Sequence, residues 1–176
     1  MISHSFMKKY HRIGGAFTLI ETLVAISILS ISIAGPLYTA NQATVATRLA
    51  HDRVVAGYLA QEAVEHVRAV RDDAFLASQE NGWDNFVDIM SGCSDDLCTV
   101  DPHAENFAIA SCSSECAPMV RADNRYRQGV AGTQTPFTRS LSYDVTQEGS
   151  FTVTVSWDHR GTPYSIEIDE QLTEWQ

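Results

Sequence analysis

The chain has 176 residues and a formal net charge of −10, a length that allows one domain with an anchor and excludes two ordinary domains. Residues 8–12 carry three of the 12 basic side chains, so the rest of the chain sets 9 basic against 22 acidic residues. A body this acidic repels phosphate backbones. We therefore expect no unspecific nucleic-acid binding, although a small local patch at Arg121, Arg125 and Arg127 leaves a minor basic surface.

The first element is an uncharged apolar stretch. Residues 22–47 include no charged side chain, and residues 17–37 are mostly Leu, Ile, Ala and Val. A membrane-spanning helix needs about 20 such residues, whereas the apolar part of a signal peptide has about 7 to 15. We therefore expect one transmembrane helix over residues 17–37, with membrane lipid around it.

Basic residues before this stretch predict its orientation. Lys8, Lys9 and Arg12 precede it, and positive charge is retained on the cytoplasmic side of a membrane. The prediction is a single-pass protein of the inner (cytoplasmic) membrane, with a cytoplasmic amino terminus and an extracytoplasmic carboxyl-terminal domain.

Glu21 is an acid inside the apolar stretch. A carboxylate at membrane depth costs roughly 2.5 to 3.5 kcal/mol, so it needs a partner or a function. No basic residue follows within two helical turns, and Arg12 lies nine positions before it. If the chain were cut just before Phe17, a new α-ammonium would appear one turn from Glu21. The same acid on a neighbouring copy could then pair with that ammonium.

Residues 14–25, Gly-Gly-Ala-Phe-Thr-Leu-Ile-Glu-Thr-Leu-Val-Ala, together with the basic leader, closely resemble the processing and methylation motif of type IV pilins and type II secretion pseudopilins. The resemblance implies that prepilin peptidase removes a cytoplasmic leader of residues 1–16. It also implies N-methylation of the new terminus and a role for Glu21 in assembly.

The cut site departs from the family pattern in one position. The family usually has glycine immediately before the cut, whereas Ala16 stands there in this chain. Cleavage after Ala16 makes Phe17 the first mature residue and Glu21 the fifth, as in the family. Cleavage after Gly15 would make Glu21 the sixth. We favour the Phe17 start; an uncleaved signal anchor is the remaining alternative.

The stem helix is expected to continue as an amphipathic segment over residues 38–77. Apolar residues recur there at spacings of three and four, which marks one buried stripe. The stripe consists of Ala56, Leu59, Ala63, Val67, Val70 and Ala74. Glu62 and His66, one turn apart, are expected on a solvated polar face.

Gly35 and Pro36 interrupt the helical pattern. Proline removes one backbone donor and crowds the preceding turn, which predicts a kink. In pilins such a proline is associated with local bending or melting of the stem, and the resemblance suggests that role. The alternative is a helix that ends near Gly35 and restarts.

Residues 78–132 have no regular period and are rich in Asp, Asn, Ser and Gly. We expect a loop-dominated region with short strands near residues 98–100 and 107–112. Its cysteines are Cys93, Cys98, Cys112 and Cys116. An even set in an exported domain predicts two disulfides, and the spacing does not fit the usual zinc knuckles. The strands favour nested pairing, Cys98 with Cys112 and Cys93 with Cys116, and local pairing within each couple is left open.

Residues 133–176 change to a period of two, which predicts three half-buried strands. Apolar and polar residues alternate over residues 137–144, 151–157 and 164–169. The simplest topology is an antiparallel meander whose apolar face covers the helix stripe. The fold class is therefore α+β, a long N-terminal helix packed against a C-terminal antiparallel sheet. The pilin resemblance implies the same plan.

No catalytic motif is present. The chain has no Gly-rich phosphate loop, nucleophile elbow or paired metal-binding histidines, and Asp95, Asp96, Asp101 and Glu105 lack the spacing of an EF-hand. We expect no enzymatic activity, cofactor or metal.

The function expected is that of a structural filament subunit, a minor pilin or pseudopilin, whose partners are other pilins or pseudopilins and prepilin peptidase. The first alternative is a membrane-anchored binding or adhesin module that uses residues 78–132. The second is an anchored exported enzyme. A retractile pilus, a secretion pseudopilus and a DNA-uptake filament all remain open as the machine served.

Overall fold

The computed structural model describes residues 17–104, 109–113 and 115–174. The chain divides into two compact units, residues 1–46 and residues 47–176, and we call the second unit the head. Helix α1 (Leu19–Ala77) supplies the described helical part of the first unit and the first element of the head. The expected long N-terminal helix is thus confirmed.

The helix includes Pro36 without a break. A helix that ends near Gly35 and restarts is therefore wrong. Proline has no N–H to donate, so the carbonyl four residues earlier, that of Ser32, lacks its helical donor. A bend at Gly35 and Pro36 stays a prediction.

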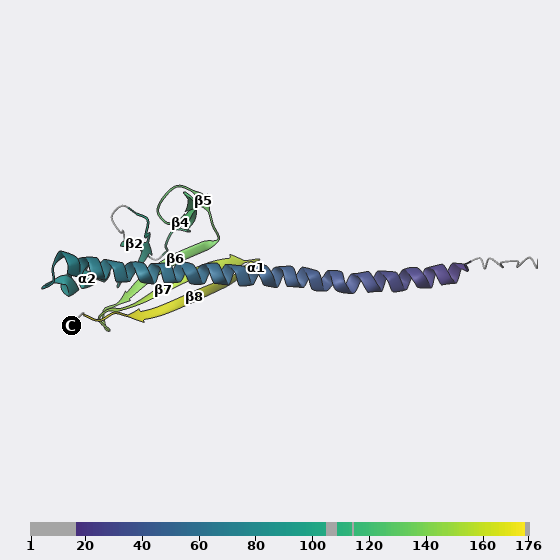
Figure 1. Ribbon diagram of the computed structural model, residues 1–176, viewed down its shortest axis with the longest axis horizontal. Helices are drawn as coiled ribbons and strands as arrows, with labels where there is room; N and C mark the ends of the chain where they lie inside the picture. The colour runs from purple at the N-terminus through teal and green to yellow at the C-terminus, as the bar shows by residue number, and fades with distance from the viewer. Residues whose placement is uncertain (1–16, 105–108, 114, 175–176) are drawn as a thin grey trace, which may run out of the picture. The chain divides into compact units, whose positions relative to one another are not determined.

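The main sheet of the head has five strands in the order β2-β1-β6-β7-β8. Its three long strands form the expected antiparallel meander, which is confirmed. The strands are β1 (Leu97–Val100), β2 (Ile109–Ser113), β6 (Phe137–Asp144), β7 (Ser150–His159) and β8 (Thr162–Gln171). Strands β6, β7 and β8 run alongside the head's part of α1 (Figure 1). The meander pairs Phe137 with Trp157 and Trp157 with Tyr164, so aromatic residues line up across the sheet.

Two turns of the meander depend on positive φ angles. Arg160 and Gly161 have φ values of 57° and 79°, the pattern of a two-residue hairpin turn between twisted strands. Gly149, between β6 and β7, has a φ of 79°, and a Cβ there would collide with the Leu172 carbonyl oxygen. Glycine is therefore required at residue 149 for both conformation and space.

The core lies between α1 and the inward face of the sheet. Ala56, Ala60 and Ala63 are fully buried on the helix, and these small side chains let it approach the strands closely. Leu141 and Val153 face them from β6 and β7 within one hydrophobic cluster. The predicted stripe is confirmed as far as Val70, and Ala74 packs at its margin.

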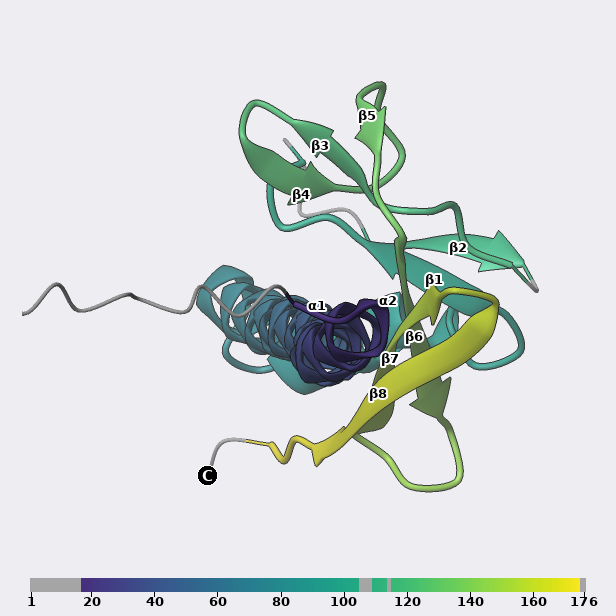
Figure 2. The same cartoon turned by 90° about the vertical axis from the view of Figure 1, so that its right-hand side faces the viewer.

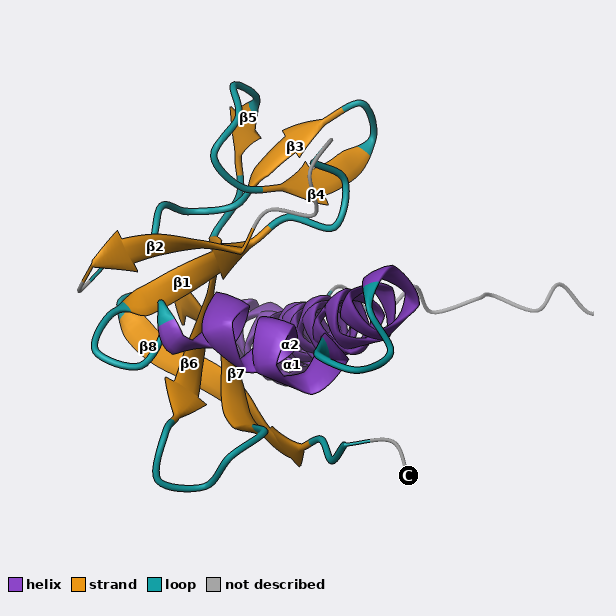
Figure 3. Ribbon diagram, turned by 90° about the vertical axis from the view of Figure 1, so that its left-hand side faces the viewer, coloured by secondary structure: helices purple, strands orange, loops and turns teal. Residues whose placement is uncertain are grey.

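Helix α2 (Gly82–Ser91) was not predicted. Its apolar residues Trp83, Phe86, Val87 and Met90 recur at helical spacing, but ten residues starting at a glycine are a weak signal. Phe86 and Met90 are fully buried. A Cβ on Gly82 would meet Phe75, so α2 lies close to the end of α1 (Figure 3). The region 78–132 is therefore more regular than expected.

A second, three-stranded sheet has the order β4-β3-β5. Its strands are β3 (Val120–Ala122), β4 (Arg125–Arg127) and β5 (Thr133–Gln134). It lies on the side of β1 and β2, away from β8 (Figure 2). Tyr126 connects it to the core, with its ring 6.1 Å from that of Phe137 in an edge-on contact.

Candidate functional site

The start of α1 is closed by a side-chain cap. The Thr18 hydroxyl oxygen accepts a hydrogen bond from the Glu21 backbone N–H at 3.3 Å, and the Thr18 carbonyl accepts from Glu21 and Thr22. Thr18 is thus the N-cap and Glu21 the third helical residue, the sequence pattern of a capping box. An acid in the first turn also stabilises the positive end of the helix dipole. Glu21 therefore has a local structural role that the sequence analysis missed.

The helix after this cap presents an apolar surface on all sides. Large side chains that are more than half exposed follow one another along residues 19–37. They are Leu19, Ile20, Leu23, Val24, Ile26, Ile28, Leu29, Ile31, Ile33 and Leu37. Among the described residues, α1 is the one helix long and apolar enough to cross a membrane. A surface of this kind needs lipid or protein around it.

The polar side chains within this surface bond to their own helix. Ser27, Ser30 and Ser32 each donate a 2.8 Å hydrogen bond to the carbonyl four residues earlier. Thr39 donates to the Pro36 carbonyl at 2.9 Å. Hydroxyl groups satisfied in this way do not require water, so they leave the helix compatible with an apolar environment.

The structure describes only part of the predicted processing site. Gly15 and Ala16 lie outside the described residues, as does the leader 1–16. Phe17 lies just before α1 and is 77% exposed. The first described residues of the predicted mature chain are thus an exposed Phe17 and the capped turn Thr18 to Glu21.

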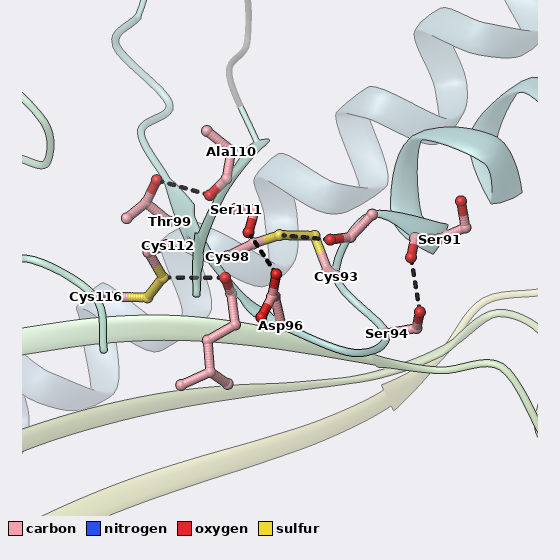
Figure 4. The surroundings of a disulfide bond; sticks show 12 residues. Ser91, Cys93, Ser94, Asp96, Cys98, Thr99, Ala110, Ser111, Cys112 and Cys116 are labelled. Carbon is pink, nitrogen blue, oxygen red and sulfur yellow. Dashed lines mark hydrogen bonds between the residues drawn. A yellow bond between two sulfur atoms is a disulfide. The ribbon is translucent and has the colours of Figure 1, made fainter. Parts of the chain in front are cut away.

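The four cysteines form two local disulfides, Cys93–Cys98 and Cys112–Cys116, with Cα separations of 5.5 and 4.9 Å. The nested pairing favoured by the sequence analysis is wrong. The register of β1 and β2 shifts between Leu97 and Cys98, so Cys98 lies opposite Ser111 rather than Cys112. Cys98 is buried and bonds to Cys93, and the Cys112–Cys116 bond is a separate pair (Figure 4).

The head contains a buried arginine to which the sequence analysis gave no role. Arg139, on β6, is fully buried. Its Nη1 donates to the Leu59 carbonyl at 2.9 Å and to Glu62 Oε2 at 2.8 Å, both on α1, and its Nη2 donates to the Val100 carbonyl on β1. Burial lowers the pKa of Arg139, while the hydrogen bond and charge of Glu62 oppose that shift. One side chain thus joins α1, β1 and β6.

Further polar groups extend this cluster toward the small sheet. The other Glu62 oxygen lies 3.5 Å from His103 Nε2. Arg127 donates to the buried Asp101 carboxylate at 3.0 Å and to the His103 carbonyl at 3.1 Å. Gln128 donates to the Arg139 carbonyl at 2.7 Å. The charged groups of this cluster pair with each other, so the cluster connects α1, the main sheet and the small sheet through ion pairs and hydrogen bonds.

The expectation of a solvated face is wrong for His66, whereas Glu62 is half-buried. His66 is only 5% exposed, and Glu62 pairs with Arg139 and His103. The sheet and the segment after β1 cover this side of α1. The sequence did contain a signal for this pair. Arg139 stands at an inward position of a strand, and Glu62 stands in the helix that the strand covers.

Within the described part of the chain, no group of three or more His, Cys, Asp and Glu side chains could hold a metal ion. Comparison with known proteins gives no match to a family model, a curated protein or a solved structure.

Proposed function

We propose that this chain is a structural subunit, a minor pilin or pseudopilin, of a type IV pilus or type II secretion-like filament. The observation that carries the proposal is the exposed apolar start of α1 with Glu21 in its first turn, directly after the pilin-like processing motif. The subunit is held in the inner membrane by residues 17–37, with its head outside. It is then built into a filament by packing of α1 against α1 of neighbouring subunits.

Processing changes the electrostatics at the start of the helix. Removal of the leader by prepilin peptidase leaves an α-ammonium on Phe17, at the positive end of the α1 dipole. The α-ammonium and the positive end of the helix dipole repel each other, so a carboxylate near them is stabilising. Glu21 of a neighbouring subunit supplies one, and the pairing sets the register between the two helices.

The first test is the amino-terminal mass of the chain purified from membranes. The proposal expects a chain that starts at methylated Phe17. An intact Met1, or a product that lacks the apolar helix, would overturn it.

The second test is filament incorporation of Glu21 variants. We expect Glu21→Ala to reduce incorporation about tenfold, which corresponds to roughly 1.4 kcal/mol, with normal cleavage and membrane insertion. Thr18→Ala is the matched control, because it removes the cap hydroxyl and keeps the carboxylate. If Glu21→Ala is incorporated at the parental level, Glu21 has no role in assembly. If both variants lose incorporation equally, the loss is due to the helix cap and not to the carboxylate.

A further inference from the structure

The head gathers exposed carboxylates at the end where α1, α2 and the β6–β7 turn meet. Trp83 on α2 donates a 2.7 Å hydrogen bond to Glu148 in that turn, and Gly82 lies against Phe75 of α1. Arg71, the nearest arginine on α1, pairs with Asp72. We call the exposed acids here the acidic end: Asp73, Glu80, Asp84, Asp88 and Glu148.

The acidic end also has an apolar hollow. Leu76 is 83% exposed, and an open depression of about 490 Å³ is lined by Asp72, Phe75, Leu76 and Gln79. Exposed apolar surface rimmed by one sign of charge is typical of a protein contact site.

Exposed arginines gather at the opposite end of the head, where the first turns of its part of α1 meet the β7–β8 turn. His159 of β7 lies 3.5 Å from Asp52 of α1, and the Arg53 guanidinium lies 5.7 Å from the centre of the Tyr164 ring. We call the three arginines here the basic end: Arg48, Arg53 and Arg160.

Two acids, Asp52 and Asp158, also lie near the basic end, so its three arginines exceed the acids there by one charge. Asp52 pairs with His51 and His159, and Asp158 accepts the Gly161 N–H in the turn. Two apolar side chains of α1, Val54 and Tyr58, are more than half exposed beside this end.

The two ends are too far apart to neutralise each other. Arg48 and Asp73 are separated by about 38 Å along the α1 axis, several times the screening length of about 8 Å at physiological salt. Two copies joined acidic end to acidic end would repel. The acidic end of one copy and the basic end of another attract, and their exposed apolar residues can be buried in the same contact.

We propose that the acidic end of one head docks on the basic end of the head of a second copy. The contact uses two different surfaces, so a docked pair leaves one acidic end and one basic end open for further copies. Repetition of such a contact gives an open helical filament where the rotation does not close a ring. This inference rests on the proposed filament function and names the contact between heads within it.

The first experiment reverses charge at the acidic end of the full chain. Asp73 and Asp88 are exposed and lie near the carboxyl ends of α1 and α2, where lysine favours the helix dipole, so Asp73→Lys/Asp88→Lys should fold. We expect its filament incorporation to fall about tenfold. Glu167→Lys, an exposed acid of β8 outside the acidic end, is the control and should incorporate like the parent. Parental incorporation of the double variant would overturn the proposal.

The second experiment restores complementarity. Arg48→Glu/Arg160→Glu should lose incorporation to a similar extent, and the chain with all four substitutions should recover most of it. Failure of the four-fold variant to recover, while it folds, would contradict a contact between these two ends. Phe17 processing and the Glu21→Ala defect are independent of these charges. If both hold while the reversed variants assemble normally, the head contact is wrong and the filament function stands.

Discussion

Arg139 shows how one buried charge holds the head together. Its guanidinium bonds to α1 through Leu59 and Glu62 and to β1 through Val100. A buried ion pair contributes little net stability compared with apolar residues of the same volume, but breaking it leaves the other charge without a partner. Arg139 therefore joins α1, β1 and β6 at one buried point, and loss of either partner of the ion pair should be costly.

A mutational prediction follows from the difference between the small net contribution of the pair and the large cost of breaking it. Glu62→Ala leaves the buried guanidinium without its carboxylate, so we expect the free energy of unfolding to fall by about 3 kcal/mol. In Glu62→Ala/Arg139→Met, the buried guanidinium is removed together with its carboxylate, and methionine fills much of the space. The double variant should be more stable than Glu62→Ala alone in chemical denaturation. A double variant that is less stable would show that Arg139 does not need Glu62.

Asp144 predicts a local pH dependence. The Thr146 hydroxyl donates a 2.6 Å hydrogen bond to its carboxylate, and the Thr146 N–H a second at 2.8 Å; these bonds lower the pKa of Asp144 below 3.8. Because the folded state favours the ionised form, this stabilisation is present above the usual pKa and is lost as pH falls through the lowered value. In an NMR titration, Thr146→Ala should move the pKa of Asp144 back toward 3.8, and an unchanged pKa would contradict this assignment.

At the scale of elements, α1 and the β6–β7 turn use glycine differently. A Cβ at Gly57, in the middle of α1, would meet nothing within 4 Å, so Gly57→Ala should raise the free energy of unfolding of the head by up to about 1 kcal/mol. Gly149→Ala should lower it by more than about 1 kcal/mol because of its positive φ and the Leu172 carbonyl. Thermal unfolding of the two variants measures whether each substitution raises or lowers the free energy of unfolding. A change of the same sign and size in both would contradict the different roles of Gly57 and Gly149.

The local disulfides give a second prediction at this scale. Glu105 lies between the two pairs in sequence. Glu115 lies between Cys112 and Cys116, so cleavage after glutamate also cuts inside the second pair. The denatured, unreduced chain should therefore release one peptide that holds Cys93–Cys98 by itself and a second species of two peptides joined by Cys112–Cys116. Mass spectrometry would detect these two species separately. A single linked species would restore the nested pairing.

At the scale of the whole chain, each unit exposes a surface that needs a partner. The first unit exposes an apolar helix whose first turn includes Glu21 and is capped by Thr18. The head carries exposed acids at one end and exposed arginines at the other. Both features underlie the proposed filament, in which apolar helices associate and unlike charged ends attract. The sequence of the apolar helix motivates the filament proposal, and the folded head supplies the two surfaces of the proposed second contact.

The sequence by itself determined the apolar helix, the amphipathic stripe that follows it and the three alternating strands. These are local periodicities, which each segment carries independently of its neighbours. Glu21 and the cysteines were also recognisable there, because their residue types are unusual in their surroundings.

Only the tertiary structure decided the roles of Arg139 and Glu62, the local cysteine pairing, the helix α2 and the two charged ends of the head. Each depends on residues far apart in the chain being brought together, such as Glu62 with Arg139 or Trp83 with Glu148. The sequence shows Arg139 in an alternating strand, but it does not show that a helix covers that side chain or which acid pairs with it. Burial and pairing are properties of the packed molecule, and no local period records them.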